Sequence, residues 1–318
     1  MKISIITATL NSCRFLEECI CSVLAQRPAD FEHIVVDGGS IDETITLAKR
    51  YPHLTIVEHP GCSIYQAWNI GLDVASGDLI GVCNSDDFYA SKTFERAIQE
   101  AASHPDAWLV GGKAIQFTKD NAGNNVFVAE YAGKHGRELC FEDLNLFGPS
   151  LNARFLTRKL VNRFGKFDTR FRLGSDCSYM MEIALNRLPA IYVDEIFYYY
   201  RSHSSSSSLG GNTSNATISL DEKLRIGSEF IASGRLQAQE RRHLRHAIAM
   251  QFVSTIVECA NRHKWSGVIK SARSFRWFSF SEGWVIAAKS CSLTCSLILK
   301  RARQRLAAAA NRANRGYK

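Results

Sequence analysis

The sequence has no Cys-x-x-Cys pair, although ten cysteines are spread over its 318 residues. The close pairs, Cys19/Cys21 and Cys291/Cys295, lack the spacing of a structural zinc site. We therefore expect free thiols in a reduced, cytosolic protein. A signal peptide is not expected either, because the chain opens directly on a short strand-like run without a basic region or a long apolar one.

Long apolar runs are also scarce. The run at residues 284–299 has 16 residues and contains Lys289, so it is too short and too charged to span a bilayer. We expect it to form an interfacial or core-packing helix. The first predicted strand is not followed by Gly-x-Gly-x-x-Gly, since residues 7–11 contain no glycine. This absence argues against a nucleotide-cofactor enzyme such as a dehydrogenase.

Acidic residues are nearly missing from the C-terminal segment. Residues 262–318 hold 13 of the 39 Lys and Arg but one of the 31 acidic residues, a net charge of +12, so the other 261 residues carry −4. Aromatic side chains such as Trp277 and Trp284 are interleaved with these cations. Such a segment suits peripheral contact with an anionic membrane, and a solvated basic face is the alternative. No nucleic-acid-binding motif accompanies the charge, so nucleic acid is not an expected partner.

The first half of the chain alternates apolar runs with helical periodicity, in a composition of 46% hydrophobic and 22% charged residues. Capping-box spacing at residues 40–43 and 63–66 predicts two helix starts. The alternation indicates an α/β fold, with a Rossmann-like, mainly parallel sheet flanked by helices. Strands are predicted at residues 3–7, 33–36, 54–57 and 79–83.

The remainder of the chain has a less regular pattern. We place a domain boundary in the serine-rich stretch at residues 204–208, which divides the chain into residues 1–205 and a helical, basic region at residues 206–318. Further strands are predicted at residues 108–117, 126–131 and 190–200, and further helices at residues 157–164, 176–185, 220–233, 237–262 and 284–306.

Polar residues follow three predicted strands at the point where each strand ends, at residues 7–11, 37–40 and 84–87. Because the carboxyl ends of parallel strands share one edge of a sheet, we expect these segments to converge. Asp86 and Asp87 are adjacent carboxylates, which repel each other unless something positive lies beside them. A divalent cation carrying a phosphorylated substrate explains the pair, and a turn with solvated acids is the alternative.

Four motifs between Thr7 and Asp87 agree in order and spacing with one family. They are Thr7-x-Thr9-x-Asn11, the run Val-Val-Asp-Gly-Gly-Ser-x-Asp-x-Thr at 35–44, the run Ile-Tyr-x-Ala-x-Asn-x-Gly at 64–71, and the run Gly-Asp-x-Ile-x-x-x-Asn-Ser-Asp-Asp at 77–87. Together they resemble glycosyltransferase family 2. The resemblance implies a GT-A fold, a nucleotide-sugar donor, a divalent metal and inversion at the anomeric carbon.

The resemblance assigns the donor half of the site. Asp86 matches the last Asp of the family's Asp-x-Asp motif and is the implied ligand of Mn²⁺ or Mg²⁺. Asp37 is assigned to the nucleotide base, where its carboxylate would accept the uracil imide N–H and favour a UDP-sugar, and helix capping is the alternative. Arg201 and His203 resemble a Tyr-Arg-x-His segment that implies a diphosphate contact and a metal ligand. The implied donor-binding residues are Thr7, Thr9, Asn11, Asp37, Gly39, Asn69, Asn84, Ser85, Asp86 and Arg201.

The acceptor half of the site is assigned by a later segment. Asp176, after Gly-x-Phe-Asp at residues 165–168, matches the family's general base, which takes a proton from the acceptor hydroxyl. The alternative role of Asp176 is the N-cap of the predicted helix that follows, and it can do both. The Gln-x-x-Arg-Trp segment of processive synthases is absent, so we expect transfer of single sugars.

These observations predict an inverting, metal-dependent glycosyltransferase that adds one sugar to a glycan or lipid-linked acceptor in cell-surface polysaccharide biosynthesis. We expect it in the cytoplasm, at the inner face of the membrane. Gly38, Trp68, Asn84 and Ser178 depart from the family's usual residues, with Trp68 either stacking or packing in place of an Arg. These departures keep open a non-catalytic nucleotide-sugar-binding protein of the same fold, beside the Rossmann cofactor enzyme already mentioned.

Overall fold

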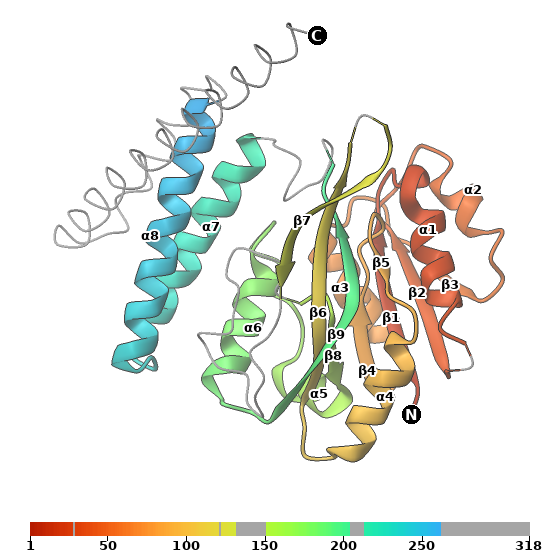
Figure 1. Cartoon of the computed structure of the whole chain (residues 1–318), viewed down its shortest axis with the longest axis horizontal. Coiled ribbons are helices and arrows are strands. Elements are labelled where there is room, and N and C mark those ends of the chain that lie inside the picture. Colours follow the sequence, from red (N-terminus) through yellow and green to blue (C-terminus); the bar gives the residue numbers. More distant parts are fainter. Residues whose placement is uncertain (28, 121, 132–150, 204–212, 262–318) are drawn as a thin grey trace, which may run out of the picture.

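The computed structural model describes residues 1–27, 29–120, 122–131, 151–203 and 213–261 (Figure 1). Its centre is a nine-stranded sheet in the order β3-β2-β1-β4-β8-β6-β9-β5, with β7 paired to β6. The strands are β1 (Ile3–Thr9), β2 (Phe31–Asp37), β3 (Leu54–Glu58), β4 (Leu79–Val82), β5 (Phe88–Tyr89), β6 (Leu109–Lys119), β7 (Asn125–Tyr131), β8 (Arg154–Thr157) and β9 (Ala190–Arg201). The helices are α1 (Cys13–Leu24), α2 (Thr44–Ala48), α3 (Ile64–Val74), α4 (Thr93–Ser103), α5 (Arg158–Phe164), α6 (Ser175–Leu185), α7 (Thr213–Ala232) and α8 (Ala238–Asn261).

The α/β architecture predicted from the sequence is confirmed, and its first four strands, β3-β2-β1-β4, run parallel. Beyond β4 the sheet is mixed, because β8 pairs antiparallel with both β4 and β6, and β5 pairs antiparallel with β9. The sequence pattern did not predict β5 or β8. The parallel half is the part that brings the ends of β1, β2 and β4 to one edge.

Helices cover both faces of the sheet. Alternate residues of a strand point to opposite faces, and in β1 Ile3 and Ile5 pack with α1 and α4 while Ile6 packs with α3. Helix α3 lies very close to β1, since a Cβ at Gly71 would lie 2.3 Å from Ile6 Cγ2. Both faces are therefore buried, as the continuous apolar runs of the parallel strands require.

The two predicted capping boxes have different outcomes. At α3 the box is confirmed, because Ser63 Oγ accepts from the Gln66 N–H and Gln66 Oε1 accepts from the Ser63 N–H at 2.8 Å. At residues 40–43 the prediction is wrong, and α2 begins only at Thr44. The reason is competition, because the Ser40 hydroxyl donates instead to the Asp37 carboxylate at 2.5 Å.

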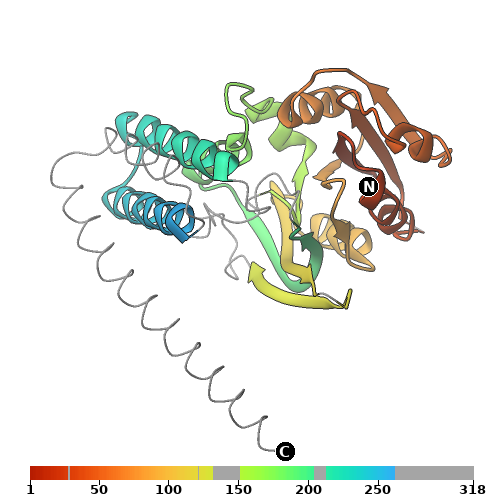
Figure 2. The same ribbon diagram turned by 90° about the horizontal axis from the view of Figure 1, so that it is seen from above.

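Helices α7 and α8 confirm the helices predicted at residues 220–233 and 237–262, and Figure 2 shows them as a pair beside the sheet. Leu224 of α7 and Leu244 of α8 share a hydrophobic cluster with Met180 of α6. The proposed boundary at residues 204–208 and the helix predicted at residues 284–306 fall outside the described residues. Among the helices in the described ranges, none combines the length and apolar character needed to cross a membrane.

Candidate active site

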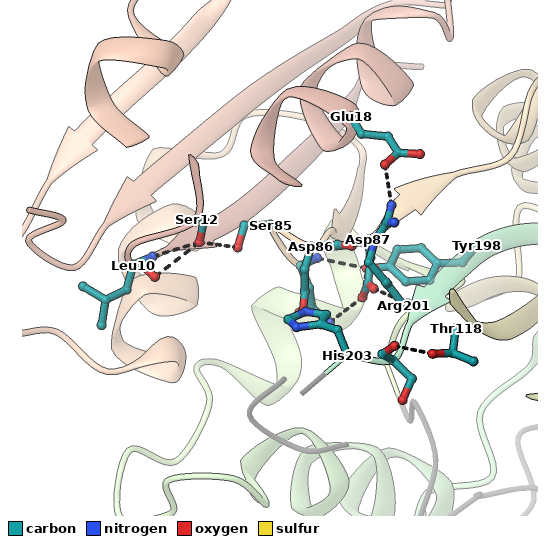
Figure 3. A network of polar contacts seen from close by, with 12 residues as sticks. Leu10, Ser12, Glu18, Ser85, Asp86, Asp87, Thr118, Tyr198, Arg201 and His203 are labelled. Atoms are coloured by element: carbon teal, nitrogen blue, oxygen red, sulfur yellow. Dashed lines mark hydrogen bonds and ion pairs between the residues drawn. The ribbon is translucent and has the colours of Figure 1, made fainter. Parts of the chain in front are cut away.

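The three polar segments predicted to converge do meet at the carboxyl edge of the parallel strands. Ser12 Oγ, after β1, lies 2.8 Å from Ser85 Oγ, after β4 (Figure 3). Asn11 accepts a hydrogen bond from the Ile41 N–H at 2.9 Å and so joins the turns after β1 and β2. The backbone of Asn11 is left-handed, with φ of 51°, and α1 is preceded by Ser12, so Asn11 is not its N-cap.

The two adjacent carboxylates after β4 have opposite environments. Asp87 is buried and accepts hydrogen bonds from Asn84 Nδ2 at 2.8 Å, Tyr198 OH at 2.9 Å and the Arg201 N–H at 2.7 Å. Burial and the charge of Asp86 raise the pKa of Asp87 well above its ordinary value. The Asn84 amide, which was predicted to face the nucleotide, is turned toward Asp87, so its observed role is to hold the turn.

Asp86 points the other way, toward a histidine 117 positions along the chain. Its Oδ2 lies 2.8 Å from His203 Nε2, and both side chains stay partly accessible, at 27% and 18% (Figure 3). A carboxylate oxygen and an imidazole nitrogen are both groups that can bind a divalent metal ion. Within the described residues no group of three or more His, Cys, Asp and Glu is arranged to hold a metal ion.

Arg201 connects this turn to α1. Its guanidinium is buried, forms an ion pair with Glu18 and donates from Nε to the Asp86 carbonyl at 2.8 Å (Figure 3). It also lies over the rings of Phe15 and Phe117, at 4.8 and 4.9 Å from their centroids. The sequence predicted a diphosphate contact for Arg201, whereas the observed partners are protein groups that fix the position of Asp86.

Asp37 organises the turn after β2. Its carboxylate accepts from Thr9 Oγ1 at 2.9 Å, from the Gly39 and Ser40 N–H groups at 2.9 and 2.8 Å, and from Ser40 Oγ. Burial opposes the charge, yet these hydrogen bonds lower the pKa of Asp37. Gly39 has φ of 98°, which explains the glycine at this turn. All four lone-pair sites of the carboxylate are thus in use, so binding a nucleotide base would require one of these bonds to open.

Two predicted donor-binding residues lie away from the edge of the sheet at which the parallel strands end. Thr7 is fully buried, and its hydroxyl lies 2.9 Å from His33 Nε2. Asn69 of α3 is also buried, donating to the Phe167 carbonyl at 2.9 Å and accepting from the Phe167 N–H at 2.8 Å. Thr7 therefore supports the core, and Asn69 anchors the segment that leads toward Asp176.

Asp176 lies in the first turn of α6, but Gly174 is the N-cap, so the capping alternative for Asp176 is wrong. Tyr65 OH donates to Asp176 Oδ1 at 2.7 Å. Burial raises the pKa of Asp176, although Tyr65 and the positive charge of Lys223 oppose the shift. Tyr65 was not predicted as a site residue, although its place in the motif at residues 64–71 was a signal for it. No sequence pattern pointed to Lys223.

An aromatic cluster backs this acid. Trp68 is buried at 5.3 Å, between ring centroids, from both Tyr65 and Phe167, so the packing role considered for Trp68 is the observed one. Its indole Nε1 has no hydrogen-bond partner among the described residues. The cluster packs against the Tyr65 ring and so holds the hydroxyl that donates to Asp176.

The structure thus combines a sheet with an acidic turn at the strand edge and a separate, half-buried acid on α6. Comparison with known proteins identifies the family. The sequence model of glycosyl transferase family 2 matches residues 4–165, about half of the chain, so the protein belongs to that family. A PGL/p-HBAD biosynthesis glycosyltransferase of Mycobacterium tuberculosis is 29% identical over 182 residues, covering 55% of this chain and 67% of the relative. An uncharacterised Nostoc glycosyltransferase, alr2836, is 25% identical over 246 residues, or 72% of this chain and 73% of the relative.

Solved structures share the fold at lower identity. Residues 1–349 of S. aureus TarS, crystallised with UDP-GlcNAc, align with a TM-score of 0.55 at 18% identity, covering 87% of this chain and 92% of TarS. The mannosyltransferase PcManGT of Pyrobaculum calidifontis, in complex with GDP-Man and Mn²⁺, gives 0.57 at 17% identity, covering 91% and 79%. These similarities establish the GT-A type of fold.

Proposed function

We propose that this protein is an inverting glycosyltransferase that moves one sugar from a nucleoside-diphosphate sugar to a glycan or lipid-linked acceptor in surface polysaccharide biosynthesis. The observation that carries the proposal is the division of the site into two acidic centres. Asp86 with His203 lies at the strand edge, and Asp176 lies on α6 beside Tyr65. A transferase needs both centres, one for the leaving diphosphate and one for the attacking hydroxyl.

In the donor half, the Asp86 carboxylate and His203 imidazole would hold a divalent ion together with diphosphate oxygens. Their 2.8 Å separation and their partial exposure fit such an ion. Mn²⁺ or Mg²⁺ bound there would stabilise the negative charge that develops on the leaving nucleoside diphosphate. Arg201 would act on this half indirectly, because its Nε holds the Asp86 main chain. Ser12 and Ser85 are placed beside the same turn to offer neutral hydroxyls.

We propose a UDP-sugar as the first donor to test. Support comes from the TarS complex with UDP-GlcNAc. Because PcManGT was crystallised with GDP-Man, the donor screen should compare uridine and guanosine diphosphate sugars. The predicted contact from Asp37 to the nucleotide base gives less support for a UDP-sugar than the sequence indicated. The Asp37 carboxylate already accepts four hydrogen bonds within the protein. Thr9, Asn11 and Gly39 lie beside the same turn and remain our proposed contacts for the donor nucleotide.

In the acceptor half, Asp176 would take the proton from the acceptor hydroxyl as that oxygen attacks the anomeric carbon. Burial raises its pKa above the ordinary value for an aspartate, which makes the carboxylate a stronger base. Direct attack by the acceptor on the face opposite the leaving diphosphate inverts the anomeric centre. We also propose that the basic residues 262–318, which lie outside the described ranges, hold the enzyme at an anionic membrane surface on the cytoplasmic side.

The decisive experiment is a donor screen that measures released nucleoside diphosphate with Mn²⁺, with Mg²⁺ and with a chelator. Asp176→Asn should abolish transfer and leave donor binding intact. Asp168→Asn is the matched control, because that carboxylate precedes the same helix but pairs with exposed Arg170. Unchanged transfer by Asp176→Asn would exclude this base. Donor binding without turnover in the unaltered protein would instead favour a non-catalytic nucleotide-sugar-binding protein.

A further inference from the structure

The buried side of the acceptor half contains a second set of polar groups, contributed by three helices. In the described part of the chain, Asp176 interacts with Tyr65 on α3, Cys177 on α6 and Lys223 on α7, and Glu222 on α7 interacts in turn with Tyr65 and Lys223. Helix α7 lies wholly beyond residues 4–165, the part matched by the family model. The neighbours of the acid therefore come partly from sequence that the family motifs do not include.

Tyr65 fixes one oxygen of the acid. Its hydroxyl donates to Asp176 Oδ1 at 2.7 Å, and its ring is buried against Trp68 and Phe167. Burial and the Asp176 charge raise the pKa of Tyr65 well above its ordinary value, so the phenol stays protonated and remains a donor. A hydrogen bond to the charged form of a carboxylate favours that form. Tyr65 thus lowers the pKa of Asp176, whereas burial raises it.

Helix α7 acts on the same acid in two ways. Glu222 accepts from the Arg172 and Leu173 N–H groups at 2.6 and 2.7 Å, which clamps the loop directly before α6. Close packing accompanies the clamp, since a Cβ at Gly174 would lie 2.9 Å from the α7 side chain Ile226. The next residue of α7, Lys223, is half-buried, and its positive charge favours the carboxylate form of Asp176.

Resting on the proposed function, we infer that Tyr65 is a positioning residue that holds the Asp176 carboxylate in place for the acceptor hydroxyl. Helix α7, which bonds to the loop before α6 through Glu222 and carries Lys223 next to it, completes the acceptor half of the site. Burial alone favours the protonated form of an acid, which cannot accept a proton. The Tyr65 hydroxyl and the Lys223 charge favour the ionised form of Asp176, while burial makes that form a stronger base. The acceptor site is therefore built from α3, α6 and α7 together.

A substrate-free titration tests this inference. Aspartate labelled with ¹³C at Cγ would be incorporated into the full-length protein, and the Asp176 signal assigned by its loss in Asp176→Asn. Tyr65→Phe should raise the Asp176 midpoint by about 1 to 2 pH units, the size expected for one hydrogen bond to a charged group. Lys223→Gln should also raise it, because a favourable positive charge is removed.

Two matched controls separate this effect from altered packing. Tyr179→Phe removes a hydroxyl from the same aromatic cluster, where it donates to the Gly165 carbonyl at 3.1 Å and not to an acid. Arg225→Gln removes a positive charge from the same helix, where the guanidinium pairs with Glu229. Both should leave the midpoint unchanged. Far-UV circular dichroism checks each variant for folding, and if Tyr65→Phe does not fold, Lys223→Gln tests the same midpoint.

The titration and the sugar-transfer assay can fail separately, so this inference and the proposed function are tested independently. A midpoint in Tyr65→Phe equal to that of the unaltered protein overturns the role of Tyr65, and an unchanged midpoint in Lys223→Gln overturns the role of α7. If Asp176→Asn retains sugar transfer, the base itself is wrong, whatever the titration gives. If that variant is inactive and the midpoints do not move, only the positioning inference fails.

Discussion

Replacing Arg201 with lysine should weaken both the fold and the donor half of the site, although the positive charge is kept. The guanidinium is buried beneath the turn after β4, where Nε donates to the Asp86 carbonyl at 2.8 Å and a terminal nitrogen pairs with Glu18. Lysine ends in a single ammonium group, so it cannot place donors at the two separate positions from which Nε and the terminal nitrogen of Arg201 reach Asp86 and Glu18. The change therefore isolates the geometry of the side chain from its charge.

The expected loss follows from the contacts. A hydrogen bond from a charged donor contributes about 1.5 to 3 kcal/mol. Planar stacking over Phe15 and Phe117, at 4.8 and 4.9 Å, contributes about 1 to 2 kcal/mol in a desolvated setting. Part of the ion pair with Glu18 survives in the lysine variant. We expect the free energy of unfolding to fall by about 2 to 4 kcal/mol.

Urea unfolding at pH 7, followed by far-UV circular dichroism, measures this loss, and an unchanged m-value shows that the unfolding transition itself is the same. Glu18→Gln is the control, because Glu18 is half exposed and the new amide oxygen can still accept from Arg201, so we expect a loss below about 1 kcal/mol. Arg201→Lys within 1 kcal/mol of the unaltered protein would contradict the reasoning. The donor kcat/KM should also fall about 10-fold or more as Asp86 loses its support.

Two other changes test the fold and the metal. Glu32 accepts from Lys2, Ser4 and Ser76, and although burial opposes them these contacts lower its pKa to about 2. Because the folded-state pKa is below the ordinary 4.5, the stabilisation is complete above about pH 5 and is lost as the pH falls toward 2. In urea unfolding Glu32→Gln should therefore be less stable by about 2 to 3 kcal/mol at pH 7, with the gap narrowing below pH 4.5. His203→Ala should raise the Mn²⁺ concentration for half-maximal transfer about 10-fold or more, and an unchanged requirement would remove His203 from the metal site.

The parallel half of the sheet could be predicted because its evidence is local. Each strand of the β3-β2-β1-β4 order has its own apolar run, and β1, β2 and β3 are each followed directly by a helix. The short strands β5 and β8 have no such signal. They exist because residues far apart pair, as when β8 is inserted between β4 and β6. Long-range pairing of a two- or four-residue segment leaves no mark on its own sequence.

The hydrogen-bond partners of the site's side chains could likewise be predicted from the sequence only in part. The sequence placed the segments after β1, β2 and β4 together, and the contact between Ser12 and Ser85 bears this out. It could not show that Asp37 would use its carboxylate within its own turn, or that Arg201 would pair with Glu18, 183 positions away. Both outcomes depend on which neighbour lies nearest after folding. A motif therefore predicts which segments of the chain come together better than it predicts which side chains bond to each other.

The motif at residues 64–71 shows how a family pattern can support a different half of the site from the one assigned to it. Asn69 was matched to donor binding, yet its amide bonds twice to the Phe167 main chain. Tyr65 lies four residues earlier, so both side chains fall on the same face of α3. From that face one reaches Asp176 and the other reaches the segment before it. The spacing of this motif is thus explained by α6 and the segment before it, because one face of α3 contacts both Asp176 and Phe167.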